Sequence, residues 1–302
     1  MTDLTAHFSR IPFLATAVNP TVTRLAGLTN TNYLVRDGSS QYVLRVPGTG
    51  TSEYIDRHNE RVAARSAAAA GVNAELLFFD PSDGLMVTRF VAGASTMTPE
   101  RFGNIGSVSR AGRAFRQLHD TATPFANDFK LFTMIDDYKA LLTKKIATLP
   151  NGYDAAHQLA AGARQVLEQN PVRLKPSHCD PLCENFLDAG DRMYIVDYEY
   201  SGNNDPMWDL GDLSVEGGFT AVQDAALLSA YFGGDAPADQ AARMVIYKAM
   251  CDLLWTLWGV IQHANANPVD NFWVYASNRF RRCQALMGSH EFTNAINVLE
   301  RL

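Results

Sequence analysis

A short segment of this chain carries polar side chains at a spacing that could support phosphoryl transfer. His178, Cys179 and Asp180 are followed by Asn185, five residues after the aspartate, and by Asp197, twelve residues after that asparagine. An aspartate can accept a proton from a hydroxyl group, and amide and carboxylate oxygens are suitable ligands for magnesium. Because phosphoryl transfer depends mainly on positioning, metal and neutralisation of charge, these groups supply most of what the reaction requires.

Each of these residues has a predicted role. We expect Asp180 to accept the proton of a substrate hydroxyl group, or to orient that hydroxyl group for attack. We expect Asn185 and Asp197 to bind Mg²⁺, and His178 to brace the loop through hydrogen bonds rather than to bind metal. For Glu199 the sequence leaves two roles open, assistance to a second metal ion and a structural hydrogen bond.

A second group of residues could bind phosphate. The segment Gly27-Leu28-Thr29-Asn30 lies between two predicted strands, where its backbone N–H groups could face phosphate oxygens. A plain hairpin turn is the alternative. Arg45 lies in the next predicted strand and Glu60 in the helix after it, and a strand-borne cation paired with a helical glutamate holds nucleotide phosphates in kinases. The alternative is a surface ion pair that contributes little to stability.

The elements that must position these residues divide the chain into two parts. Alternation and turn signals predict strands near residues 21–26, 31–36, 42–46, 76–79 and 85–90, with one helix at 54–70. Helical spacing predicts helices at 99–120, 133–148 and 154–169 and from about 221 to the end, interrupted by a hairpin over 186–198. We therefore expect an α+β protein with a small antiparallel sheet lobe (1–90), a larger mainly helical lobe (91–302) and a ligand site between them.

Composition narrows the possible partners. The chain has 302 residues, 47% of them hydrophobic and 19% charged, with a net charge of −6. Nucleic acids and anionic membranes require clustered positive charge, so we expect neither as a partner.

The four cysteines have no zinc-like spacing and are expected to be thiols. The most apolar stretch, 244–261, contains Lys248 and Asp252, which indicates a buried helix. With no basic leader segment, a cytoplasmic location is expected, and the sequence does not indicate an oligomeric state.

The chain resembles the choline/ethanolamine kinase family, within the aminoglycoside-phosphotransferase-like and protein-kinase-like fold. The motifs that carry the resemblance span about residues 20–282: GLTNTNYL (27–34), VLRVPG (43–48), HCDPLCENFL (178–187), IVDYEYSGNNDPMWD (195–209) and LWTLWGVIQ (254–262). The resemblance implies a two-lobed kinase-like fold, with ATP and Mg²⁺ as cofactors. It adds Asn32 to the nucleotide-binding residues and implies that Asp209 braces the catalytic loop.

The resemblance also implies a substrate site. A quaternary ammonium group cannot donate a hydrogen bond, so aromatic faces and nearby negative charge must recognise it. The family's choline pocket uses aromatic residues and an acid, a role that falls here on Tyr200, Glu216, Trp255, Trp258 and Tyr275. Trp255 and Trp258 lie three residues apart on one predicted helix and point to the same side. The alternative is that the tryptophans only fill a helical core.

Two positions depart from the pattern of the family. Cys179 stands where asparagine is common, and Leu182 stands where many eukaryotic members have glutamine. Pro181 and Glu184 resemble the bacterial branch. Loss of a polar side chain at Leu182 could remove a contact to the hydroxyl end of the substrate.

The resemblance implies a small-molecule kinase that transfers the γ-phosphoryl group of ATP to choline, giving phosphocholine and ADP. One alternative keeps the chemistry and changes the acceptor to ethanolamine, thiamine, another amino alcohol or an aminoglycoside. An alternative of a different class is a catalytically inactive protein that binds trimethylammonium compounds. The intact residues Asp180, Asn185 and Asp197 argue against that class.

Overall fold

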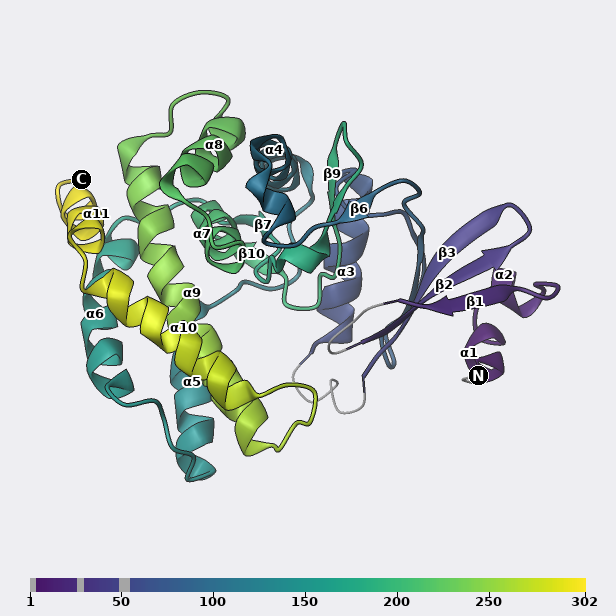
Figure 1. Ribbon diagram of the computed structural model, residues 1–302, viewed down its shortest axis with the longest axis horizontal. Coiled ribbons are helices and arrows are strands. Elements are labelled where there is room, and N and C mark those ends of the chain that lie inside the picture. Colours follow the sequence, from purple (N-terminus) through teal and green to yellow (C-terminus); the bar gives the residue numbers. More distant parts are fainter. Residues whose placement is uncertain (1–3, 26–29, 49–54) are drawn as a thin grey trace.

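The computed structural model describes residues 4–25, 30–48 and 55–302. A small β-sheet with the N-terminus lies at one end of an elongated molecule, and a larger helical part with the C-terminus lies at the other (Figure 1). This is the predicted two-lobed α+β arrangement.

The sheet of the small lobe has five antiparallel strands in the order β1-β2-β3-β5-β4. The predicted strands are confirmed with small shifts at their ends. They are β1 (Thr21–Arg24), β2 (Thr31–Asp37), β3 (Ser40–Val46), β4 (Leu76–Asp80) and β5 (Leu85–Arg89). Asn32 of β2 lies opposite Arg45 of β3, so two predicted phosphate-binding residues are neighbours in the sheet.

Two short helices before the sheet were not predicted. They are α1 (Thr5–Phe8) and α2 (Pro12–Ala15), and their segment buries Leu4, Ile11 and Leu14 against the sheet. Arg10, between them, forms ion pairs of 2.6 Å with Asp80 and with Asp83 in the β4–β5 turn. Four-residue helices carry too little periodic pattern to be recognised in a sequence.

The helix of the small lobe, α3 (Arg57–Ala69), carries Glu60. The Asp56 side chain accepts hydrogen bonds from the backbone N–H groups of His58 and Asn59, at 2.9 and 3.1 Å, and caps the helix. The predicted start at residue 54 lies outside the described residues. Gly71, with φ of +72°, follows the end of the helix, as predicted.

The larger lobe is mainly helical, as predicted. Its helices are α4 (Ile105–Thr121), α5 (Leu131–Lys144), α6 (Tyr153–Gln169), α7 (Pro206–Glu216), α8 (Ala221–Phe232), α9 (Ala238–Ala264), α10 (Phe272–Met287) and α11 (His290–Glu300). The predicted start of α4 at residue 99 was wrong. A 3₁₀ turn over Arg101–Gly103 comes first, and Asn104 caps the helix at Gly106 N. Helix α7 was not predicted, because it is buried along nearly its whole length and has no solvent-exposed polar face.

Helix α9 lies at the centre of the larger lobe. By length and composition alone it could cross a membrane, but 83% of its most apolar window is buried inside the protein. That burial is typical of the core helix predicted at 244–261. Gly211 allows α7 to approach α9 closely, since a Cβ there would lie 2.9 Å from Met244 O.

Short strands flank the segment that carries the predicted catalytic residues. Strand β7 (Lys175–Ser177) ends directly before His178 and pairs with β10 (Gly202–Asn204). Strands β8 (Phe186–Asp188) and β9 (Met193–Ile195) form the predicted hairpin, and β6 (Ser95–Thr96) pairs with β8. The three-residue strands β7 and β10 were not predicted, and they fix both ends of the catalytic segment.

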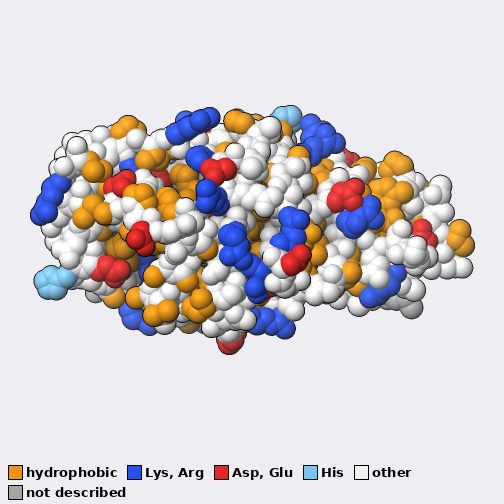
Figure 2. Space-filling view, turned by 90° about the horizontal axis from the view of Figure 1, so that it is seen from above, with side chains coloured by type: hydrophobic (Ala, Val, Ile, Leu, Met, Phe, Trp, Pro, Cys, Tyr) orange, Lys and Arg blue, Asp and Glu red, His pale blue; other side chains and the backbone are white. Residues whose placement is uncertain are grey.

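On the face shown in Figure 2, charged side chains of both signs are interspersed with hydrophobic ones over both lobes. All four cysteines are buried free thiols, as expected.

Candidate active site

The backbone of the catalytic segment is held by one buried carboxylate. Asp209 accepts hydrogen bonds from the backbone N–H groups of His178 (2.7 Å) and Cys179 (2.8 Å). It also accepts one from the ring of His119, at 3.0 Å, whose other nitrogen meets Tyr231 Oη. Asp209 therefore lies where the family resemblance places a loop-bracing aspartate.

The backbone carbonyl groups of the same two residues also accept hydrogen bonds. Ser201 Oγ donates to His178 O at 2.9 Å, and Trp208 Nε1 donates to Cys179 O at 3.1 Å. Cys179 and Asp197 have φ angles of 68° and 69°, in the left-handed region. Such conformations cost on the order of 1–3 kcal/mol each and persist only where the surroundings enforce them. Together these contacts fix the position of Asp180, the next residue.

His178 connects the two segments that carry Asp180 and Asp197. Its Nε2 donates to Val196 O at 2.9 Å, and the rings of His178 and Tyr198 pack edge to face. Because a carbonyl oxygen only accepts hydrogen bonds, this contact places the ring proton on Nε2. Burial lowers the pKa of His178, which favours the neutral ring. The Nε2–Val196 O hydrogen bond is a contact of the kind expected of a bracing residue.

Asn185 lies next to Asp180. Its Nδ2 donates to Asp180 O at 3.1 Å, and its backbone carbonyl accepts from Val196 N at 2.9 Å. With Nδ2 engaged in this way, the amide oxygen is the atom that Asn185 can offer to a metal ion.

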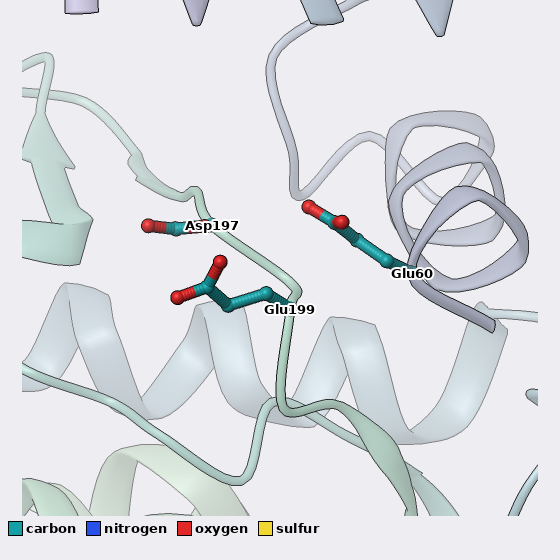
Figure 3. Close-up of side chains that lie close together, drawn as sticks. All are labelled: Glu60, Asp197 and Glu199. Atoms are coloured by element: carbon teal, nitrogen blue, oxygen red, sulfur yellow. The ribbon is translucent and has the colours of Figure 1, made fainter. Parts of the chain in front are cut away.

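Three carboxylates from both lobes converge close to this segment. Glu60 of α3 points toward Asp197 and Glu199, which lie on the segment after β9 (Figure 3). One oxygen of each lies within 4.8 Å of the others. Burial, and then the neighbouring Asp197 carboxylate, raise the pKa of Glu199 to about 7. Burial also raises the pKa of Asp197, although Arg45 opposes it. Crowded oxygen donors of this kind suit a divalent cation.

Two arginines join this carboxylate cluster. Arg45 forms a buried ion pair with Glu60 and a second one with Asp197, at 2.8 Å, which links the two lobes. Arg57 forms ion pairs with Glu60 at 2.6 Å and with Glu199 at 3.5 Å. Arg57 was not among the predicted site residues, although its spacing three residues before Glu60 on a helix is a signal for such a pair.

Only part of the predicted phosphate-binding loop can be located, because Gly27, Leu28 and Thr29 lie outside the described residues. Asn30, at the end of that loop, donates from Nδ2 to Glu199 at 3.1 Å and accepts from the Gly48 backbone at 3.4 Å. The loop therefore ends beside the carboxylate cluster.

The predicted aromatic residues lie in two groups. Tyr200 and Trp255 meet edge to face with ring centroids 5.6 Å apart. The Trp258 ring centroid lies 5.7 Å from that of Tyr275 and 5.5 Å from that of Phe272, a residue that was not among the predicted site residues. Burial of the tryptophans is uneven, since Trp255 is buried and Trp258 is half-buried.

Glu216, the predicted acid of the substrate site, is ion-paired. Arg279 contacts Glu216 and also Asp252, the latter at 3.1 Å, while its guanidinium lies 4.7 Å from the centre of the Tyr275 ring. Arg282 contacts Asp252 at 2.7 Å. Arg279 lies four residues after Tyr275, a helical spacing that could have indicated this contact.

Asp180 lies within electrostatic reach of both halves of the site. Its pKa is raised well above the ordinary value, first by burial and then by the carboxylates of Glu216, Glu199 and Asp197, while Arg279 opposes the shift. The charges that act on the predicted base therefore come from the carboxylate cluster and from the Glu216–Arg279 pair. A cavity of about 450 Å³ elsewhere, lined by Gly71, Arg192 and Tyr194 among others, contains none of the predicted site residues.

Comparison with known proteins identifies the family. Residues 22–225 match the family model described as choline/ethanolamine kinase. A choline/ethanolamine kinase family protein from Mesorhizobium loti is 53% identical, with 99% of each chain covered and a TM-score of 0.91. Choline kinase LicA from Streptococcus pneumoniae is 26% identical over 95% of this chain and 98% of that one, with a TM-score of 0.79. A structure of LicA in complex with AMP is 25% identical, with coverages of 95% and 99% and a TM-score of 0.75. The chain is therefore an ATP-dependent phosphotransferase of the choline/ethanolamine kinase family.

Proposed function

We propose that this protein transfers the γ-phosphoryl group of ATP to the hydroxyl group of choline, giving phosphocholine and ADP. The observation that carries the proposal is the position of Asp180. It follows a backbone fixed by Asp209, and burial and the carboxylates of Glu216, Glu199 and Asp197 raise its pKa. The likeness to a solved choline kinase supports the same acceptor.

On the nucleotide side, the oxygen donors fit a magnesium ion. Asn185 through its amide oxygen and Asp197 through its carboxylate would hold it, with Glu199 adjacent. When bound, Mg²⁺ neutralises charge on the phosphate oxygens. The guanidinium group of Arg45 contacts Glu60 and Asp197 in this structure. The same N–H groups can bind two phosphate oxygens. Asn30, Asn32 and the loop residues before them would complete the phosphate site.

On the acceptor side, Asp180 would orient the substrate hydroxyl group and take up its proton. Burial and three neighbouring carboxylates raise the pKa of Asp180, so a donor hydroxyl group is a suitable partner for its carboxylate. His178 and Asn185 keep Asp180 in place through the segments that they join.

The ammonium head of choline would lie against aromatic rings. Tyr200, Trp255, Trp258 and Tyr275 can each contribute about 0.5–2 kcal/mol of cation–π attraction. Methyl groups on the nitrogen favour ring faces over hydrogen-bond acceptors.

The proposal includes a boundary between the lobes at residues 90 and 91 and a cytoplasmic location, where ATP is available. The last strand of the five-stranded sheet ends at Arg89, which supports that boundary.

Initial rates of ADP release test the acceptor. We expect choline to give the highest kcat/KM among choline, ethanolamine, thiamine and an aminoglycoside, measured with ATP and Mg²⁺. Replacing Trp255 or Trp258 by alanine should raise KM for choline about tenfold or more, with a smaller effect on KM for ATP. A higher kcat/KM for ethanolamine than for choline would contradict the proposed acceptor and keep the chemistry.

A further inference from the structure

At the substrate end of the site, some carboxylates have an ion-pair partner among the described residues and one does not. Glu216 and Asp252 face Arg279 and Arg282, so two carboxylates meet two guanidinium groups. The negative charge of Glu216, predicted to attract a cation, is thus already offset by Arg279. A carboxylate without such a partner would attract a cationic substrate more strongly.

Asp212 is that carboxylate. It lies on α7, three residues after Asp209 and four before Glu216, so the helix turns all three toward the same side. Its side chain is buried, and it takes part in no ion pair among the described residues. Oδ2 accepts a hydrogen bond of 3.3 Å from Trp255 Nε1. Oδ1 is buried and has no hydrogen-bond partner within the described part of the chain.

A buried carboxylate oxygen without a partner is costly, and proteins retain one where a ligand completes it. The groups that act on Asp212 include the carboxylates of Glu216 and Asp180, the Arg279 guanidinium and the Trp255 indole. Burial and the two carboxylates raise the pKa of Asp212, and Arg279 only partly opposes them. A cation against Trp255 would supply the missing positive charge.

We propose that Asp212, rather than Glu216, provides the negative charge by which the site selects a cationic amino alcohol over a neutral alcohol of the same shape. The inference rests on the proposed function and adds a specificity-determining residue to it. Trp255 has a double role in this arrangement. Its ring contacts Tyr200, and its N–H fixes the orientation of the Asp212 carboxylate.

The test compares choline with 3,3-dimethyl-1-butanol, in which carbon replaces the charged nitrogen. The ratio of kcat/KM for the two alcohols is measured for the wild-type protein and for Asp212→Asn. Where turnover of the butanol is too slow, its inhibition constant against choline is measured instead. Both values come from one preparation, so the ratio does not depend on the active fraction. We expect Asp212→Asn to lower the preference for choline about tenfold or more, since a close, desolvated charge pair is lost. Asp212→Ser should lower it similarly.

Two further variants serve as controls. Asp224→Asn also removes one carboxylate that contacts α7, but Asp224 is paired with Lys248 at 2.6 Å and hydrogen-bonded to Ser214, so the preference should be unchanged. Glu216→Gln should lower the preference less than Asp212→Asn, because Arg279 already offsets Glu216.

An unchanged preference in Asp212→Asn, or a larger loss in Glu216→Gln, would overturn the role of Asp212. In both cases the wild-type protein would still phosphorylate choline, and the proposed function would stand. A wild-type protein that phosphorylates neither choline nor another amino alcohol would instead contradict the proposed function.

Discussion

At the scale of single residues, the site depends on which buried charges have partners. Asp209 is satisfied by two backbone N–H groups and His119, and it acts as a fixed support. Arg45 bridges Glu60 and Asp197. Asp180 and Asp212 have no ion-pair partner among the described residues, and burial together with neighbouring carboxylates raises the pKa of both.

Replacing Asp180 by asparagine tests its role at this scale. We expect kcat to fall about 10²–10⁴-fold, because the proton acceptor is lost while the shape of the side chain is kept. Choline affinity, measured by calorimetry, should change little. Retention of most of the turnover in Asp180→Asn would contradict the assignment of the base.

At the scale of elements, the close approach of α10 to α9 positions Tyr275. A Cβ on Gly259 would lie 2.7 Å from the Tyr275 ring and 3.1 Å from Ala276 Cβ. We expect Gly259→Ala to destabilise the protein by about 1–3 kcal/mol and to raise KM for choline more than KM for ATP. Urea unfolding and initial rates measure the two effects.

Gly162 is the matched control on another helix. It is exposed on α6, and no atom lies within 4 Å of the position of a Cβ. Gly162→Ala should stabilise the protein by about 0.5–1 kcal/mol, as expected for an open helical position. Equal effects of the two substitutions would show that α9 and α10 are not closely packed at Gly259.

The N-terminal segment gives a prediction about pH. Hydrogen bonds from Ser82 and Arg10 lower the pKa of Asp80 to about 2. Because the pKa in the folded state is below that in the unfolded chain, Asp80 stabilises the protein at neutral pH, and this contribution is lost as the pH falls from about 4 to about 2. Asp80→Asn should cost about 1 kcal/mol or less at neutral pH, since the pair with Arg10 is partly exposed.

The measurement is the difference in unfolding free energy between Asp80→Asn and wild type as the pH is lowered. It should shrink toward zero below about pH 4. A difference that grows on acidification would contradict the sign of the pKa shift.

The sequence predicted the elements with long regular patterns, including the five strands and the helices around α9. It did not predict α7 or the pair β7 and β10. Helix α7 lacks a solvent-exposed polar face because other elements surround it, and three-residue strands with Pro176 and Gly202 show no alternation. Motif spacing predicted Asp180, Asn185 and Asp197, while the importance of Arg57 and Asp212 depends on contacts between distant segments.

At the scale of the whole molecule, charged contacts connect the two lobes at the proposed nucleotide site. The Arg45–Asp197 and Arg57–Glu199 pairs each join the small lobe to the larger one. A ligand that binds both lobes should therefore stabilise the whole protein.

Thermal unfolding with ATP tests this expectation. ATP and Mg²⁺ together should stabilise the wild-type protein by about 2.7 kcal/mol at a concentration 100 times Kd. Chelation of the metal should remove most of that gain. In Asp197→Asn, the stabilisation by ATP should be the same with and without Mg²⁺, and a metal-dependent gain of wild-type size would contradict the role of Asp197.

The most direct test of the account is ³¹P NMR of the purified protein with ATP, Mg²⁺ and choline. We predict that a phosphocholine resonance grows in step with ADP and that neither forms at a comparable rate in Asp180→Asn. Choline binding without formation of phosphocholine, or release of inorganic phosphate in its place, would contradict the assignment of this protein as a kinase that phosphorylates choline.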